Sequence, residues 1–231
     1  MEKSCVIGCG AISTMHLGAI EAIADKTTLV AVCDIKPDRA NAAAEKYGCK
    51  AYTDYIQMLD EEKPTVVHVC TPHYLHFEMS AECMKRNINV VLEKPSTMTY
   101  PQALELCEIA KKSSAKISIC FQNRYNACVQ YVMNVIENCE MGKIKSIRAF
   151  VTWDRGADYY SDDWHGTLEK ECGGVLINQA IHTVDLIQYF GGKCKALTAH
   201  VANDHLKGKI EVEDNASVLM ELENGVTAML Y

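Results

Sequence analysis

The first half of the chain alternates short, continuously apolar runs with longer segments of helical periodicity. Strands with one solvated face alternate apolar and polar residues, and these runs do not. They fit a parallel sheet that helices cover on both faces, so we predict a doubly wound α/β fold with right-handed crossovers. The expected strands are 4–8, 28–33, 65–70, 88–92 and 117–121, and the expected helices are 11–24, 37–48, 74–86 and 100–113.

The segment Gly8-Cys-Gly10-Ala-Ile-Ser13 lies in the turn between the first strand and the first helix. It follows the pattern G-x-G-x-x-G, with Ser13 in place of the last glycine. Gly8 permits the tight turn, Gly10 lets the backbone approach a pyrophosphate, and Ser13 is small enough for the helix to pack on the strand. Glycine-rich turns also occur for purely structural reasons. Here the flanking strand and helix favour a dinucleotide site, with the anion at the helix N-terminus.

Asp34 lies at the end of the second strand, where a carboxylate would accept hydrogen bonds from ribose hydroxyls. An acid before a proline is also common as a turn residue. The negative charge favours NAD, because the 2′-phosphate of NADP would face it. Lys36 and Arg39 stand close enough to leave NADP open.

The pattern changes after about residue 140. We expect a strand at 143–153, a loop at 154–172, a helix that follows Gly173-Gly174 and runs to about 190, and strands at 196–203, 213–222 and 226–231. Asn224-Gly225 predicts a type I′ hairpin before the last strand.

A helix followed by antiparallel strands indicates a second domain of the α+β class. We therefore predict a dinucleotide-binding Rossmann domain over 1–121 and a substrate-binding and oligomerisation domain over 122–231. Tyr231 falls inside an expected strand. We accordingly expect a truncated chain whose second sheet lacks its C-terminal part.

Composition excludes several classes of protein. The chain has 23 Lys and Arg against 30 Asp and Glu, and no basic stripe that would neutralise a nucleic acid. No apolar run is long enough to span a bilayer. The 12 cysteines form no C-x-x-C pair. We expect no secretory signal at the start of the chain. We expect a soluble, cytoplasmic protein with reduced cysteines and no metal site.

Two further motifs suggest catalysis. Lys94, in Glu93-Lys94-Pro95, follows a buried run, and a lysine at the carboxyl edge of a parallel strand points toward the ligand crevice. Asn178, His182 and Asp185 are spaced to share one helix face. His182 could then take a hydroxyl proton, with Asp185 orienting it and Asn178 holding the substrate. Alternatively, Lys94 is a surface lysine, Asn178 is a helix N-terminal residue and His182 is a hydrogen-bonded core histidine.

Together, four motifs resemble the Gfo/Idh/MocA oxidoreductases, named for glucose–fructose oxidoreductase and inositol dehydrogenase. They are the glycine turn, Thr71-Pro72 with His76, Glu93-Lys94-Pro95, and Gly173-Gly174-Val-Leu-Ile-Asn178-Gln-Ala-Ile-His182-Thr-Val-Asp185. They occur in the family's order over nearly the whole chain.

The resemblance implies a Rossmann domain followed by an open-faced sheet domain that often dimerises. We therefore expect a homo-oligomer if that sheet is complete. The resemblance assigns catalysis to Lys94, which positions substrate and nicotinamide, and to His182, the acid/base. Many members have Asp where this chain has Asn178, so Asn178 would only orient the substrate.

The remaining site residues follow from the motifs and the resemblance together. The expected cofactor contacts are Gly8, Gly10, Ala11, Ile12, Ser13, Asp34, Thr71, Pro72, His76, Glu93, Lys94 and Gln122. The expected substrate contacts are Lys94, Arg124, Trp153, Trp164, Asn178 and His182. Arg124 and the two tryptophans belong to this set because guanidinium groups suit hydroxyls or carboxylates and aromatic rings suit sugar faces. Equally, the aromatic residues would serve to cover the end of the sheet.

The sequence thus predicts an NAD(P)-dependent oxidoreductase that moves a hydride between nicotinamide and a secondary alcohol of a sugar, inositol or related polyol. Two alternatives stay open: an NAD-dependent glycosidase of the same fold, and a non-enzymatic dinucleotide-sensing regulator. Sugars, inositols, nucleotide-sugars and diols all occur as substrates among the proteins it resembles, and no motif chooses between them.

Overall fold

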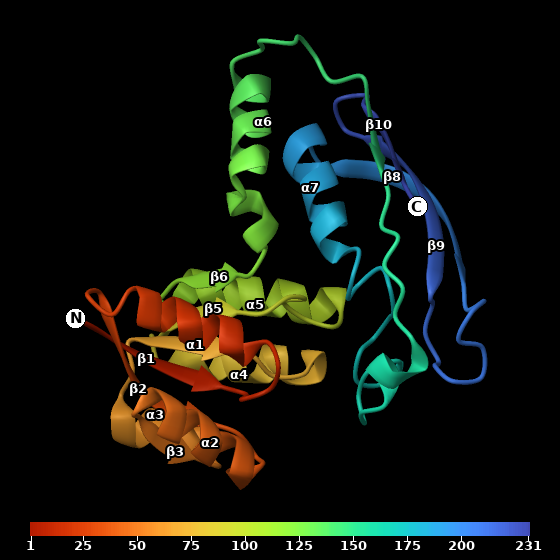
Figure 1. The fold of residues 1–231 in the computed structure, drawn as a ribbon. Helices are drawn as coiled ribbons and strands as arrows, with labels where there is room; N and C mark the ends of the chain where they lie inside the picture. Colours follow the sequence, from red (N-terminus) through yellow and green to blue (C-terminus); the bar gives the residue numbers. More distant parts are fainter. The chain divides into compact units, whose positions relative to one another are not determined.

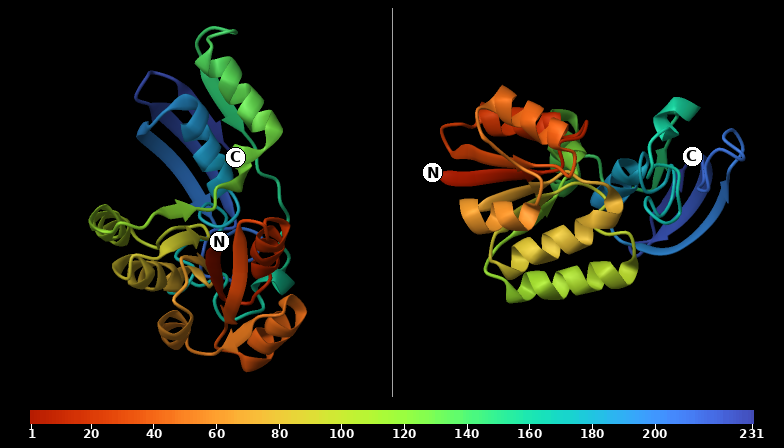
Figure 2. Two further views of the ribbon diagram at one scale, coloured as in Figure 1. Left: turned by 90° about the vertical axis from the view of Figure 1, so that its left-hand side faces the viewer. Right: turned by 90° about the horizontal axis from the view of Figure 1, so that it is seen from below.

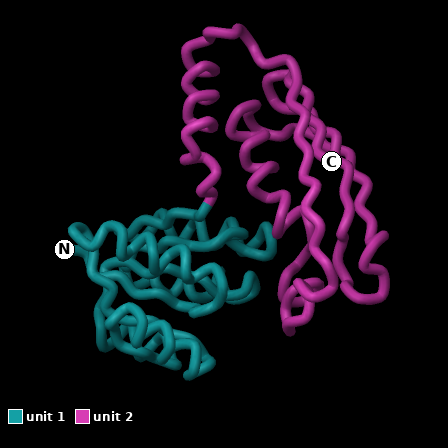
Figure 3. Tube along the Cα trace, viewed as in Figure 1, with its two compact units in different colours: residues 1–120 teal, residues 121–231 magenta.

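The computed structural model describes residues 1–231. The chain forms two compact units, Met1–Cys120 and Phe121–Tyr231, which Figure 3 colours separately. Each unit has its own sheet and its own buried apolar cluster. The predicted fold class is confirmed: a doubly wound parallel sheet followed by an α+β unit.

The first unit is a six-stranded parallel sheet in the order β3-β2-β1-β4-β5-β6 (Figure 1). Its strands are β1 Glu2–Ile7, β2 Thr27–Cys33, β3 Lys50–Tyr52, β4 Val66–Val69, β5 Asn89–Leu92 and β6 Ile117–Ile119. Its helices are α1 Ser13–Ala22, α2 Pro37–Tyr47, α3 Tyr55–Glu62, α4 His76–Lys85 and α5 Tyr100–Lys112. The sequence patterns miss β3 and α3, because both are too short to show a clear apolar period.

Alternation along the strands divides the apolar core of this unit into two layers. Cys5 and Ile7 of β1 belong to a cluster with residues of α3, α4 and α5. Val6, between them, belongs to a second cluster with residues of α1 and α2. Successive side chains of a strand point to opposite faces, so the continuous apolar run fills both layers at once. The helices on the two sides of the sheet can be followed in Figure 2.

The second unit has a four-stranded mixed sheet in the order β7-β10-β9-β8. Its elements are α6 Ala127–Glu137, β7 Ser146–Ala149, α7 Ile181–Gly191, β8 Cys194–Ala202, β9 Asn215–Leu222 and β10 Thr227–Leu230. Ile187 of α7 packs in one cluster with Leu222 and Leu230 from the sheet. In β9 and β10 buried and exposed residues alternate, as expected for a sheet with one covered face.

Two predictions for this unit are wrong in detail. The strand expected at 143–153 shortens to β7, and the helix expected directly after Gly173-Gly174 begins only at Ile181. Residues 175–180 form turns instead. The Asn178 N–H donates to the carbonyl of Gly174 and the Gln179 N–H to that of Val175, as in an α-helix, and the Ala180 N–H then donates to the same Val175 carbonyl. This bond spans five residues, one more than the α-helical ladder, so it closes a turn that does not continue as a helix. Asn178 therefore lies before α7 rather than on it.

The predicted hairpin between β9 and β10 is confirmed, but its turn type differs. Leu222 pairs with Val226 around a three-residue loop, and the Gly225 N–H donates to the Leu222 carbonyl at 3.0 Å. Gly225 has φ +81°, whereas Asn224 does not have a positive φ. A type I′ turn needs positive φ at both central residues, so this is the longer turn with glycine in the left-handed position. None of the helices combines the length and the apolar character that a membrane crossing requires.

We expect Leu92→Ala to lower the free energy of unfolding of the first unit by about 2–5 kcal/mol, because it opens a cavity at a fully buried site in β5. Leu104→Ala, on the exposed side of α5, should change it by less than about 0.5 kcal/mol. Urea unfolding of both variants measures the difference. Equal losses in the two would contradict the two-layer core.

Candidate active site

The glycine turn after β1 is shaped for close approach. Gly8 has φ +91°, and a Cβ there would lie 2.7 Å from the carbonyl oxygen of Cys70, so no other residue fits without strain. At Gly10 nothing lies within 4 Å of the position that a Cβ would take, which leaves the backbone open. The Ser13 hydroxyl donates to the Gly10 carbonyl at 2.6 Å and so braces the turn against α1. Ala11 and Ile12 are exposed beside it.

Asp34, directly after β2, is held by backbone on both sides. Its Oδ2 accepts from the Cys9 N–H at 2.8 Å, and its Oδ1 accepts from the Lys36 N–H at 2.8 Å. Its side chain is nearly buried, and the first of these bonds ties it to the middle residue of the glycine turn. An open backbone at Gly10 next to a fixed carboxylate fits the pyrophosphate and ribose of a dinucleotide.

The loops after β4 and β5 are joined by one buried histidine. His76 places Nδ1 2.6 Å from the carbonyl oxygen of Pro95 and Nε2 2.8 Å from that of Thr71. Burial lowers the pKa of His76 below its ordinary value. The peptide bond between Lys94 and Pro95 is cis. The neutral ring of His76 donates to one of the two carbonyls, and it lies between the loop that holds Thr71 and Pro72 and the loop that holds Lys94.

Glu93 belongs to a chain of buried polar side chains at the carboxyl ends of the strands. His16 of α1 donates from Nε2 to Glu93 Oε1 at 3.0 Å, and its Nδ1 lies 2.9 Å from Nδ1 of His68 in β4. Desolvation alone would raise the pKa of Glu93, but the hydrogen bond and charge of His16 bring it below its usual value. Burial and the neighbouring His16 lower the pKa of His68 to about 4.

Cys120 lies close to His16 and Glu93, and the three side chains have the spacing of metal ligands. The ligand atoms of His16, Glu93 and Cys120 all lie within 4.8 Å of one another. The Cys120 thiol is hydrogen-bonded to Glu93, and burial is the main cause that raises its pKa to about 12. Since only the thiolate binds a metal well, the high pKa disfavours an ion here. The hydrogen bonds among the three account for their grouping.

In the second unit His182 lies in the first turn of α7, with its ring 6.1 Å from that of Phe121. Asp185 does not orient it, contrary to the prediction. The two oxygens of Asp185 accept from the guanidinium of Arg124, one of them at 2.7 Å, and the Arg124 guanidinium also lies over the ring of Tyr189. Asp185 is nearly buried, and the bidentate pair holds Arg124 in place.

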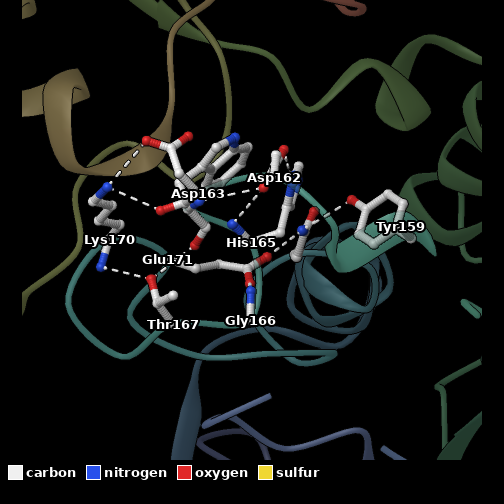
Figure 4. A network of polar contacts seen from close by, with 10 residues as sticks. Tyr159, Asp162, Asp163, His165, Gly166, Thr167, Lys170 and Glu171 are labelled. Atoms are coloured by element: carbon white, nitrogen blue, oxygen red, sulfur yellow. Dashed lines mark hydrogen bonds and ion pairs between the residues drawn. The ribbon is translucent and has the colours of Figure 1, made fainter. Parts of the chain in front are cut away.

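Asn178 lies in a polar network with three residues of the loop that precedes it. Its Nδ2 donates to Oε1 of Glu171 and to the hydroxyl of Tyr159 at 3.2 Å. Glu171 also accepts from the Gly166 N–H, and Figure 4 shows Glu171 and Gly166 side by side in this network. The desolvation of this fully buried carboxyl raises its pKa above the usual value.

The two predicted tryptophans lie at different places in the same unit. The Trp164 ring stacks on His165 with 3.6 Å between centroids. Trp153 is exposed and lines a cavity of about 630 Å³, together with Arg155 and Gln179. The Arg155 guanidinium lies 5.6 Å from the Trp153 ring and 4.8 Å from the Tyr159 ring. Trp153 thereby connects to the Asn178 network through Arg155 and Tyr159.

Gln122 begins a short 3₁₀ helix, η2, over Gln122–Tyr125.

Sequence reasoning missed His16, His68 and Glu171. A polar residue at a core position of α1 or within the apolar run of β4 is the signal that would have found the histidines. Glu171 carries no such signal, because nothing in an irregular loop marks it as fully buried.

Comparison with known proteins agrees with this architecture. Residues 3–121 match the model of the GFO/IDH/MocA oxidoreductases with an NAD-binding Rossmann fold, and residues 129–231 match the model of the GFO/IDH/MocA C-terminal domain. The chain belongs to the GFO/IDH/MocA family. The predicted resemblance is confirmed.

Named relatives in this family act on sugars and polyols. The chain is 31% identical to D-glucoside 3-dehydrogenase of Escherichia coli over 84% of its length and 56% of that protein. It is 27% identical to myo-inositol 2-dehydrogenase of Thermotoga maritima over 97% of its length and 66% of that protein. The chain thus spans between about half and two thirds of the length of these relatives.

A solved structure has a similar arrangement over nearly the whole chain. The WlbA dehydrogenase of Chromobacterium violaceum, in complex with NADH and UDP-GlcNAcA, is 33% identical, with a TM-score of 0.94. The match covers 99% of this chain and 66% of that one. Together the comparisons place the chain in a family of NAD(P)-dependent sugar and polyol dehydrogenases.

The half-buried His68 predicts an acid-sensitive first unit. Its folded pKa is about 4 against an ordinary 6.5, so the unfolded chain binds its proton more readily. The contribution of this pKa difference to the unfolding free energy is complete above pH 6.5 and is lost as the pH falls toward 4. Between pH 7 and pH 5, we expect wild type to lose roughly 2 kcal/mol more unfolding free energy than His68→Asn.

Urea unfolding at the two pH values measures this difference. His200→Asn, which changes an exposed histidine of β8, serves as the matched control and should keep the wild-type loss. An equal loss in wild type and His68→Asn would show that the His16–His68 contact does not suppress protonation.

Proposed function

We propose that this chain transfers a hydride between NAD and a secondary alcohol of a sugar, inositol or related polyol. The observation that carries the proposal is the fixed Asp34 carboxylate beside the open backbone of Gly10. That pair suits the ribose and pyrophosphate of a dinucleotide, and its charge disfavours the 2′-phosphate of NADP.

The other proposed cofactor contacts follow from the same edge of the parallel sheet. Thr71 and Pro72 follow β4, while Glu93 and Lys94 follow β5, and ligands of doubly wound sheets bind at the carboxyl ends of the strands. Gln122 of η2 completes the proposed set. A bound nicotinamide supplies the hydride acceptor or donor; the protein supplies orientation and proton transfer.

On this proposal His182 takes the proton of the reacting hydroxyl, since an imidazole titrates near neutral pH. Lys94 stabilises the negative charge that develops on the same oxygen. Asn178 holds a neighbouring substrate group, and Trp153, Trp164 and Arg124 shape the surroundings. Because a carboxamide cannot take up a proton, proton transfer rests with His182 rather than Asn178.

The relatives indicate which substrates to try first. A D-glucoside, myo-inositol and UDP-GlcNAcA all occur among the relatives' names and ligands. Leu197 and Val201 of β8 and Leu219 of β9 are exposed apolar side chains, which suits the homo-oligomer proposed for this fold.

We expect the chain to bind NADH more tightly than NADPH. Asp34→Asn should lower the affinity for NADH roughly 10-fold and reduce the difference between the affinities for NADH and NADPH. The substitution removes the negative charge of Asp34 and replaces one of its two acceptor oxygens by an amino group. Titration of nicotinamide fluorescence measures both affinities. Asp38→Asn, which removes an exposed charge from the first turn of α2, should change neither. Equal affinity of wild type for both nucleotides would contradict the role of Asp34.

We expect His182→Ala and Lys94→Ala each to lower turnover at least about 100-fold with NADH affinity unchanged. Rates of NADH production over a panel of polyols, glycosides and UDP-sugars measure this. His200→Ala, an exposed histidine on β8, is the control and should keep wild-type turnover. Unchanged activity in either site variant would overturn the assignment, and sugar release without net NADH would favour glycoside cleavage instead.

A further inference from the structure

We propose that Glu171 is a positioning residue that turns the carboxamide of Asn178 so that its carbonyl oxygen, rather than its amino group, meets the substrate. The inference deepens the proposed function and rests on it, because Asn178 is a proposed substrate contact. It makes the site selective for a hydrogen-bond donor, such as a hydroxyl, at this position.

Glu171 has no exposed surface, and its carboxylate lies between two donors. Its Oε2 accepts from the backbone N–H of Gly166 and its Oε1 from Nδ2 of Asn178. A carboxylate accepts at both oxygens and donates at neither, so it suits this place. A glutamine of the same shape would place its own N–H group against the N–H of Gly166 or of Asn178.

The carboxylate also decides which way Asn178 faces. The two N–H groups of its Nδ2 are directed to Glu171 and to the Tyr159 hydroxyl. If the amide turned over, its carbonyl oxygen would face the Glu171 carboxylate and the bond would become a repulsion. The amide is therefore held with Oδ1 as the group directed away from Glu171.

The loop around Glu171 is braced, so its carboxylate has a fixed place (Figure 4). The Glu171 N–H donates to the carbonyl of Thr167 at 3.0 Å. His165 places Nδ1 2.6 Å from Asp162, and Lys170 donates to Asp163 at 3.2 Å. These contacts hold both ends of the segment that leads into Glu171.

The same geometry explains why an asparagine suits position 178 in this chain. An aspartate there would put a second carboxylate at hydrogen-bond distance from buried Glu171. Two carboxylates so close cannot both stay ionised, and they would share a proton. A carboxylate at position 171 therefore pairs well with an amide at position 178, and a carboxylate moved to position 178 pairs well with an amide at position 171.

This exchange gives the test. We expect Glu171→Gln to lower kcat/KM roughly 10- to 100-fold, mainly through KM, because the Asn178 amide loses its preferred orientation. Asn178→Asp should show a loss of similar size. The double variant, Glu171→Gln with Asn178→Asp, should recover about 10-fold over the weaker single variant. In it the new amide at position 171 donates to the new carboxylate at position 178 and still accepts from the Gly166 N–H. Glu169→Gln, the matched change of an exposed glutamate in the same loop, should behave as wild type.

A measurement without substrate separates this inference from the proposed function. In the NMR spectrum of the 231-residue chain, the Asn178 side-chain N–H signals are assigned by their loss in Asn178→Asp. We expect slow exchange of these protons in wild type and in Glu169→Gln, and fast exchange with shifted signals in Glu171→Gln. NADH affinity and far-UV circular dichroism report that each variant is folded.

Unchanged Asn178 signals in Glu171→Gln would overturn the inference, and so would a wild-type KM in that variant or a double variant no better than either single one. A chain that shows the expected signals but oxidises no polyol would overturn the proposed function and leave Glu171 as the group that orients Asn178.

Discussion

The first unit depends on one constraint: a parallel sheet must have both of its faces covered by helices. The alternation of Cys5, Val6 and Ile7 between two apolar layers shows how one strand meets it. Because every strand runs the same way, all carboxyl ends meet at one edge of the sheet. The glycine turn, Asp34 and Glu93 lie at that edge for the same reason, so the packing that builds the core also builds the site.

At that edge polar groups are buried, and burial requires that each be partnered. Asp34 accepts two backbone N–H groups, and Glu93 is held by His16. The second unit follows the same rule with other partners: Asp185 pairs with Arg124, and Glu171 lies between two donors. In each case the buried carboxylate fixes a neighbour that the proposed function uses or a loop that supports it.

The two units divide the proposed work. The first presents an open backbone and a fixed carboxylate that suit a dinucleotide. The second presents His182 and an oriented Asn178, which suit a hydroxylated substrate. Membership of the GFO/IDH/MocA family agrees with this division of roles, because named relatives include dehydrogenases of sugars and inositols. The pairing of Asn178 with Glu171 is the feature of this chain that would select the substrate group.

Local sequence predicted most of the Rossmann unit, since apolar period, the glycine turn and Asp34 all act within about one strand and one helix. It failed where elements are short or irregular: β3, α3, the start of α7 and the turn at Gly225. It also could not pair side chains distant along the chain. His16 with Glu93, and Arg124 with Asp185, meet only because the fold brings their elements together. Whether a carboxylate such as Glu171 is a solvated loop residue or a buried acceptor is decided by tertiary burial, which no local pattern records.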